Sequence, residues 1–171
     1  MNALQLWTKA SRTRLGQWWQ LKSAPGRRRM DLALYRISGG RLTLLSGLLP
    51  CLMLTTTGRR SGRRYTTPVV YTREAGEVIV VASKDGTPGD PQWLLNLRVK
   101  PVAELSIRGA RASYAARILD PNEAGWEALW SLALERNPTY AVYRQSKGHA
   151  IPVVAFRPIV AARVGGDEPP G

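Results

Sequence analysis

Residues 51–72, CLMLTTTGRRSGRRYTTPVVYT, contain the pattern that decides the fold. Residues 51–57 are apolar and then β-branched, which is typical of a strand, and residues 58–62, GRRSG, have the composition of a tight turn. Residues 66–72 are rich in β-branched side chains and tyrosine, so they predict a second strand. Another turn composition follows at residues 74–76, EAG, so this stretch predicts a series of antiparallel hairpins.

Further strand patterns lie downstream of this hairpin. Residues 77–82 contain the unbroken run Val-Ile-Val-Val, which indicates a strand buried on both faces. Residues 102–108 alternate apolar and polar side chains, and residues 111–119 and 151–157 have the composition of two more strands. Roughly six mostly antiparallel strands in hairpin order predict an α+β fold, for which a small barrel with peripheral helices is the natural closure.

Two helices are predicted to begin where a capping residue precedes a proline. Asp90-Pro91 has the form of an N-cap followed by proline at the first helical position. Residues 120–123, DPNE, resemble a capping box and predict a second helix of the same kind, which Asn137-Pro138 ends. No glycine-rich dinucleotide or P-loop motif accompanies these helices, which argues against nicotinamide and nucleoside triphosphate binding.

Positive charge is concentrated at the N-terminus. The chain has 171 residues and a net charge of +13, and residues 1–50 contain nine Lys or Arg residues against one acid. A helix over residues 3–22 would combine tryptophans with basic side chains, which suits either an anionic membrane surface or docking on protein. We therefore divide the chain into a basic helical extension (1–41), a barrel domain (42–160) and a disordered tail (161–171). The apolar run from residue 42 is too short to span a bilayer, so a soluble or peripheral protein is expected.

Three local patterns are candidates for chemistry. Residues 58–64 contain four arginines between two strands, a composition that suits either a phosphate site or a solvated basic turn. Ser83 and Lys84 follow a predicted strand end, where ligands often bind. Tyr140 and Tyr143 would share a helix face and either line a pocket or pack half-buried. One histidine and one cysteine rule out a disulfide framework and the usual zinc sites, so no metal is expected.

Taken in order, these patterns resemble the deazaflavin (F420)-dependent nitroreductase family of split β-barrel flavin and deazaflavin oxidoreductases. The specific signature is T-T-x-G-R-x-S-G over residues 55–62, followed by P-x-W-x-x-N-L over residues 91–97. The resemblance implies a split β-barrel that binds coenzyme F420, an 8-hydroxy-5-deazaflavin with a phosphate and a polyglutamate tail. It also implies hydride transfer from the reduced cofactor to an electron-poor acceptor such as a quinone, an enone or a nitroaromatic.

The resemblance also implies roles for individual positions. Ser83, Tyr140 and Tyr143 would be catalytic and would stabilise or protonate the developing anion. The positions implied for cofactor binding are Arg59, Arg60, Ser61, Gly62, Arg64, Thr67, Pro68, Val70, Ala82, Ser83, Lys84, Trp93 and Asn96.

Two positions depart from the family pattern. Tyr65 stands where many members have an arginine, so Arg63 or Arg64 is expected to substitute for it. Asn137 stands where a third family tyrosine would fall, which predicts an altered substrate pocket. An FMN-dependent oxidoreductase on the same barrel and a non-catalytic F420 carrier at the membrane surface remain the alternatives. We expect a small-molecule acceptor, no nucleic acid, a monomer or homodimer, and a cytoplasmic location. The N-terminal segment is expected either to bind the inner face of the cell membrane or to pack on protein.

Overall fold

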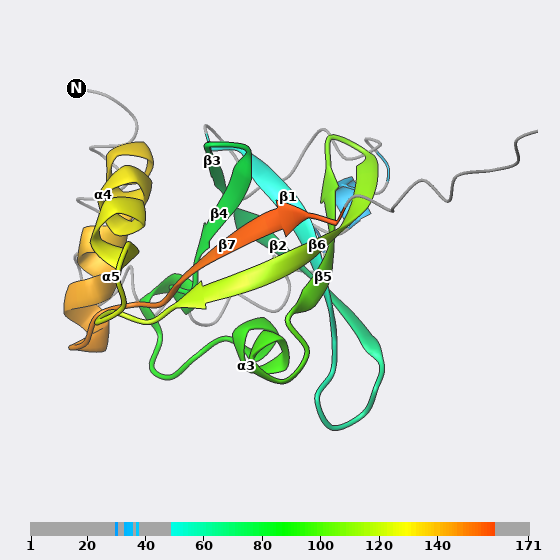
Figure 1. The fold of residues 1–171 in the computed structure, drawn as a ribbon, viewed down its shortest axis with the longest axis horizontal. Coiled ribbons are helices and arrows are strands. Elements are labelled where there is room, and N and C mark those ends of the chain that lie inside the picture. The colour runs from blue at the N-terminus through cyan, green and yellow to red at the C-terminus, as the bar shows by residue number, and fades with distance from the viewer. Residues whose placement is uncertain (1–29, 31–32, 36, 38–48, 160–171) are drawn as a thin grey trace, which may run out of the picture.

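The computed structural model describes residues 30, 33–35, 37 and 49–159, and the strands among them form one curled antiparallel sheet (Figure 1). The sheet has seven strands in the order β2-β1-β5-β6-β7-β4-β3. The strands are β1 (Cys51–Thr57), β2 (Arg64–Val70), β3 (Thr72–Glu74), β4 (Glu77–Val81), β5 (Val102–Ile107), β6 (Ala110–Leu119) and β7 (Val153–Pro158).

The sheet curls into a half-barrel. β1 pairs with β2 on one side and with β5 on the other, while β4 pairs with β3 and β7. β2 also contacts β4, although four strands lie between them in the order of the sheet. This contact across the interior brings the two edges of the sheet toward each other, as a split β-barrel requires, and the α+β prediction is confirmed.

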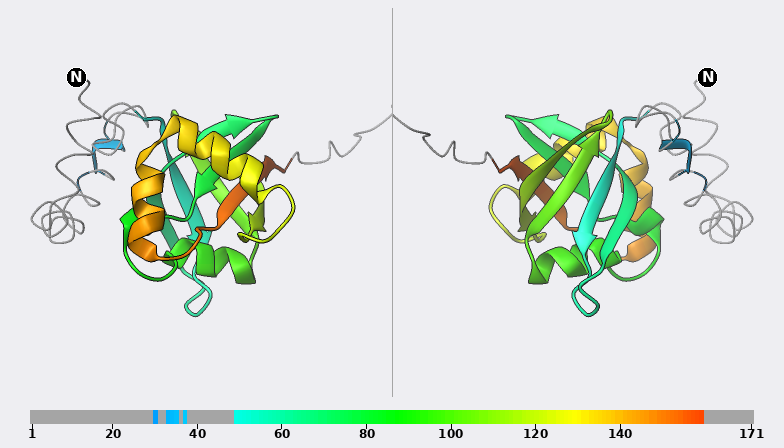
Figure 2. Two further views of the ribbon diagram at one scale, coloured as in Figure 1. Left: turned by 90° about the vertical axis from the view of Figure 1, so that its left-hand side faces the viewer. Right: turned by 90° about the vertical axis from the view of Figure 1, so that its right-hand side faces the viewer.

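Within residues 49–159, three α-helices cover the half-barrel. Helix α3 (Gln92–Val99) lies against β1, and α4 (Trp126–Arg136) contacts β4 and β7. Helix α5 (Thr139–Lys147) follows and lies beside the short 3-10 helix η1 (Lys84–Gly86). Figure 2 shows α4 and α5 together over one side of the strands, with α3 at the lower end of the sheet.

Strand β4 confirms the prediction of burial on both faces. Val78, Ile79 and Val80 each expose only 1% of their surface, although neighbouring strand residues point in opposite directions. One face of β4 is turned to the barrel interior and the other is covered by α4, so both faces lose contact with water. The neighbouring strand β7 is buried in the same way through residues 153–156.

The sequence prediction needs correction at one strand and two helix starts. The predicted strand over residues 66–72 is two strands, β2 and β3, because Tyr71 interrupts the ladder and donates its N–H to the Pro50 carbonyl. The sheet therefore has seven strands rather than six. Helix α3 begins at Gln92, one residue later than expected, with Pro91 rather than Asp90 at the N-cap.

The predicted capping box before α4 is wrong. Helix α4 begins at Trp126, after Gly125 in the left-handed region at φ 88°. The carboxylate of Asp120 instead accepts two hydrogen bonds from the Arg98 guanidinium, at 2.7 and 2.9 Å. An ion pair with a residue 22 positions away thus replaces the expected local cap, and the helix starts later.

The outer face of β5 also differs from the alternating pattern. The alternation over residues 102–108 places Ser106 among the polar, outward-facing side chains, yet it is only 7% exposed because Tyr35 covers it. The Tyr35 hydroxyl lies 2.6 Å from the Ser106 carbonyl oxygen and 2.9 Å from Oγ of the same residue.

The predicted helix over residues 3–22 and the tail over 161–171 lie outside the described residues. None of the helices in the described part of the chain is both long and apolar enough to cross a lipid bilayer.

Candidate functional site

The basic turn, defined as residues 58–63, joins β1 to β2 and confirms the turn prediction. The Gly58 N–H donates to the Arg63 carbonyl at 2.7 Å, and the Gly62 N–H donates to the Gly58 carbonyl at 2.9 Å. Gly62 has φ 67°, a conformation that glycine adopts without steric cost. A Cβ on Gly58 would lie 2.6 Å from the ring of Tyr65, so glycine lets that ring lie against the turn.

The arginines around this turn have different partners. Arg64 forms an ion pair with Glu104 on β5 at 2.9 Å, and Arg59 donates to Gln92 on α3 at 2.9 Å. Arg60 and Arg63 are exposed, and their guanidinium groups have no hydrogen-bond or ion-pair partner among the described residues. These two are therefore the arginines of the turn that can meet an anionic ligand without breaking an existing contact, which favours Arg63 over Arg64 as the substitute for the missing family arginine.

A second group of polar side chains lies where β4 ends. Ser83 is 8% exposed, and the Lys84 ammonium donates to the Pro88 carbonyl at 2.7 Å. The Lys147 ammonium, from the last turn of α5, donates to the next carbonyl, Gly89, at 3.0 Å. Burial lowers the pKa of Lys147; the nearby Asp90 opposes this and Lys84 adds to it. No carboxylate of the described residues is in salt-bridge range of either ammonium, although Asp85 and Asp90 belong to the same loop.

The two predicted tyrosines differ in their surroundings. Their rings are 6.3 Å apart on α5, but Tyr140 is 6% exposed and lies in the core, whereas Tyr143 is half-buried. Burial raises the pKa of Tyr140 far above its usual range, and the Asn137 side chain hydrogen-bonds to its hydroxyl. Asn137 is itself buried and accepts the Thr139 N–H at 3.2 Å. The amide at the third-tyrosine position thus holds Tyr140 in place.

Two of the predicted cofactor residues are largely internal. Trp93 is 7% exposed and belongs to the hydrophobic core, and Asn96 is 4% exposed. Asn96 Nδ2 donates to Thr56 Oγ1 at 3.1 Å, and its Oδ1 accepts the Arg59 N–H at 3.1 Å. The sequence motif did not indicate this arrangement, although the four-residue spacing of Gln92 and Asn96 on α3 places both on the face that meets Arg59.

The remaining predicted positions are divided between the faces of their strands. Pro68 and Val70 share one face of β2 because they are two residues apart, and Thr67 lies on the opposite face. Ala82 is fully buried just after β4, and its N–H donates to the Pro152 carbonyl at 2.9 Å. The structure therefore does not bring all the β2 positions to one surface.

Sheet topology brings the basic turn to the same end of the barrel as the loop after β4 that carries Ser83 and Lys84, here called the β4 loop. Each neighbouring pair from β1 through β5, β6 and β7 to β4 is antiparallel, so β1 and β4 run in the same direction. Their C-terminal residues, Thr57 and Val81, consequently lie at the same end of the barrel, with α3 between the two loops that follow them (Figure 1). Positive side chains far apart in the sequence thus gather at one end of the sheet.

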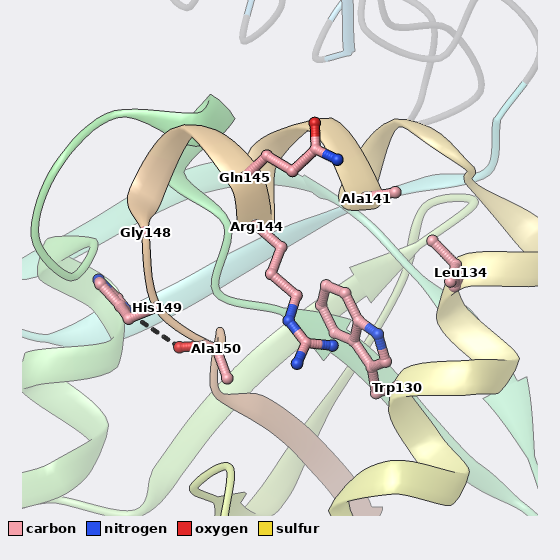
Figure 3. Close-up of a pocket in the computed structure, with 8 residues that line it drawn as sticks. All are labelled: Trp130, Leu134, Ala141, Arg144, Gln145, Gly148, His149 and Ala150. Carbon is pink, nitrogen blue, oxygen red and sulfur yellow. Dashed lines mark hydrogen bonds between the residues drawn. The ribbon is translucent and has the colours of Figure 1, made fainter.

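A separate shallow pocket lies between α4 and α5. Its volume is about 560 Å³, and Figure 3 shows Arg144 reaching toward Trp130, with His149 and Ala150 at the rim. The Arg144 guanidinium lies 5.5 and 5.6 Å from the ring centroids of Trp126 and Trp130. None of the residues predicted from sequence lines this pocket, which therefore lies apart from the candidate cofactor site.

The curled half-barrel, with a basic turn at one end, is the fold of split-barrel flavin and deazaflavin oxidoreductases. The chain belongs to the F420H(2)-dependent quinone reductase family, whose sequence pattern matches residues 27–158. Its cofactor is coenzyme F420, and it is an F420-dependent reductase. No finding favours the FMN-dependent enzyme or the non-catalytic carrier.

Known proteins show the same relationship at the level of sequence and fold. The F420H(2)-dependent quinone reductase Rv1261c of Mycobacterium tuberculosis is 32% identical over 130 residues, 75% of this chain and 87% of the relative. A solved F420-H2 dependent reductase (FDR-A) is 33% identical, with a TM-score of 0.56 over 63% of this chain and 94% of that structure. A second solved structure, described as a domain-swapped dimer, is 27% identical, with a TM-score of 0.58 over 82% of this chain and 98% of the relative.

The residues present fit this cofactor. F420 carries a phosphate and a polyanionic tail, and the exposed guanidinium groups of Arg60 and Arg63 are unpaired within the described residues. Lys84 adds an ammonium group at the same end of the sheet. Charge-assisted hydrogen bonds from such donors are the usual way in which proteins hold phosphate and carboxylate groups.

Proposed function

We propose that this reductase uses a quinone as its acceptor and binds it beside Tyr143 at the end of β4. The observation that supports this proposal is the placement of Tyr143 against Gly86, where its half-buried ring adjoins the loop that carries Ser83 and Lys84. A flat aromatic wall suits a planar, largely apolar acceptor, and neighbouring hydroxyl groups suit its carbonyl oxygens. The quinone reductase names of the family and of its relatives point to the same substrate class.

The chain's own residues would divide the work. Arg60, Arg63 and Lys84 would hold the anionic part of the cofactor, which supplies a hydride when bound in its reduced form. The Tyr143 hydroxyl, helped by Ser83, would donate a hydrogen bond to the quinone oxygen on which negative charge develops. Tyr140 would act by packing its ring against that of Tyr143, because its own hydroxyl is buried and hydrogen-bonded to Asn137.

Oxidation of F420H2 by the purified chain tests this function. We expect a soluble quinone such as menadione to be reduced with a higher kcat/KM than an enone or a nitroaromatic of similar size. Two controls give the background loss of F420H2 absorbance, one without acceptor and one without protein. A nitroaromatic or enone that exceeds the quinone tenfold in kcat/KM would contradict the acceptor assignment and leave the cofactor assignment standing.

We also propose that the enzyme is cytoplasmic and binds the inner face of the cell membrane through its basic N-terminal segment. The support is the sequence alone, with nine Lys or Arg residues and one acid among residues 1–50. Cosedimentation of the full chain with vesicles tests it. Binding to phosphatidylglycerol vesicles, but not to phosphatidylcholine vesicles, is expected, and the combined changes Arg27→Gln, Arg28→Gln and Arg29→Gln should weaken it.

Assembly as a homodimer is a further proposal, with a monomer as the alternative. Its support is the 27% identical solved relative that is described as a domain-swapped dimer. Light scattering of the purified protein distinguishes the two states by molar mass, because one chain has a mass of 18.9 kDa.

A further inference from the structure

The basic turn is tied to helix α3 through a single arginine. Asn96 Oδ1 accepts the main-chain N–H of Arg59 at 3.1 Å and lies 3.4 Å from Nη1 of the same residue. Gln92 Oε1 accepts a hydrogen bond from that Nη1 atom at 2.9 Å. Asn96 is itself fixed from behind, since its Nδ2 donates to Thr56 Oγ1 at 3.1 Å in a buried position.

Among the residues that the structure describes, no other hydrogen bond or ion pair joins the basic turn to the rest of the protein. The other hydrogen bonds of residues 58–63 to described residues are internal to the hairpin. They join Gly58 with Arg63, Gly62 with Gly58, the Arg63 N–H with Ser61 Oγ at 3.3 Å, and Ser61 Oγ with the Tyr65 hydroxyl at 3.1 Å. Helix α3 therefore sets where the exposed end of the hairpin points. Because Arg60 follows Arg59 directly, the bond to the Arg59 N–H also places the start of the Arg60 main chain.

We propose that Asn96 and Gln92 are positioning residues of the cofactor site, which act through Arg59 and need no contact with the cofactor. This inference rests on the placement of the F420 phosphate and tail at the basic turn proposed above. Asn96 holds the main chain of the turn, and Gln92 fixes the direction of the Arg59 guanidinium. Their loss spreads the arginines over more conformations, and binding of a polyanion then has to restrict them again.

A double-mutant cycle on cofactor affinity tests the proposal. The Kd for F420 is measured by quenching of its fluorescence, which requires no turnover. Gln92 is exposed, so Gln92→Met removes its acceptor while keeping the length of the side chain. We expect Kd to rise about threefold in the otherwise unchanged protein, which corresponds to the loss of one modest hydrogen bond. In the Arg59→Met background the same change should leave Kd unaltered.

Two further variants sharpen the cycle. Gln145→Met makes the same substitution at an exposed position on α5 and should leave Kd unchanged in both backgrounds. Asn96→Ala should raise Kd by more than Gln92→Met, and part of that rise should persist in the Arg59→Met background because Asn96 also holds the Arg59 main chain. If Asn96→Ala fails to fold, the Gln92 cycle alone decides.

The outcomes separate this inference from the function on which it rests. An equal rise in Kd for Gln92→Met in both Arg59 backgrounds overturns the inference, because Gln92 would then act independently of Arg59. No rise in either background overturns it as well, as does an Arg59→Met variant that binds F420 normally. If the unchanged protein fails to quench F420 fluorescence, the cofactor assignment itself fails.

Discussion

Gly86 lies directly against the ring of Tyr143, so that a Cβ atom on Gly86 would come within 2.8 Å of Tyr143 Cδ1. The contact joins the loop after β4 to helix α5. It brings the predicted strand-end residues Ser83 and Lys84 into the neighbourhood of a predicted active-site tyrosine. Gly86 also has φ 75°, so its main chain is in a region that disfavours other residues.

The first prediction concerns this contact. Gly86→Ala should lower the free energy of unfolding by more than the roughly 1–2 kcal/mol that a left-handed alanine costs, because the added methyl also displaces Tyr143. Gly76→Ala is the matched control, since Gly76 has φ 81° but no atom lies within 4 Å of the position that its methyl group would take. Urea unfolding compares the two. Equal losses for both variants would mean that Tyr143 yields without cost.

The arginines of the basic turn provide the second prediction. Arg60→Met and Arg63→Met should each raise the Kd for F420 about tenfold, because each removes a cation that can bind the phosphate or the tail. Arg64→Met should have a smaller effect, since Arg64 already pairs with Glu104 at 2.9 Å. Fluorescence titrations at two salt concentrations measure these changes. An Arg64→Met variant that binds worse than both others would reverse the assignment.

Tyr143 and Tyr140 should differ when each hydroxyl is removed. Tyr143→Phe should lower kcat for quinone reduction about a hundredfold, the usual cost of losing one donor to a developing oxyanion, with little change in F420 affinity. Tyr140→Phe should instead lower the free energy of unfolding by about 1 kcal/mol, because it breaks a buried hydrogen bond with Asn137. Steady-state kinetics and urea unfolding of both variants test the distinction. A large loss of turnover in Tyr140→Phe alone would exchange the two roles.

The ion pair between Arg98 and Asp120 makes stability depend on pH. The hydrogen bond from Arg98 lowers the pKa of Asp120 below its ordinary value of 3.8. The ionised Asp120 carboxylate therefore stabilises the folded protein above pH 4, and this stabilisation is lost as the pH falls through the lowered pKa. Both side chains are over one-third exposed, so Asp120→Asn should cost only about 0.5 kcal/mol at pH 7. The urea midpoints of the two proteins should converge as the pH falls below the lowered pKa of Asp120, and a constant difference would show that the charge is irrelevant.

Several elements of the fold could be predicted because their signals are local. The hairpin over residues 51–70 follows from β-branched strands around a glycine-bounded turn, and the burial of β4 follows from its unbroken apolar run. The start of α4 could not be predicted in this way. The local capping signal at Asp120 competes with an ion pair to Arg98, and only the packing of α3 shows that Arg98 lies within reach.

The sequence by itself determined the antiparallel hairpins of a small barrel, the basic composition of the turn and the shared helix face of the two tyrosines, because these depend on residue type and on spacing along a strand or helix. The split-barrel class came from the resemblance of its motifs to a known family. The tertiary structure decided which of these groups are available. Arg59 is engaged by Asn96, 37 residues away, and Arg64 by Glu104 on another strand, which leaves Arg60 and Arg63 exposed. Tyr140 and Tyr143 share a helix, yet one is buried and one faces the β4 loop. The physical reason is that hydrogen bonding and burial depend on neighbours that only the folded chain brings together.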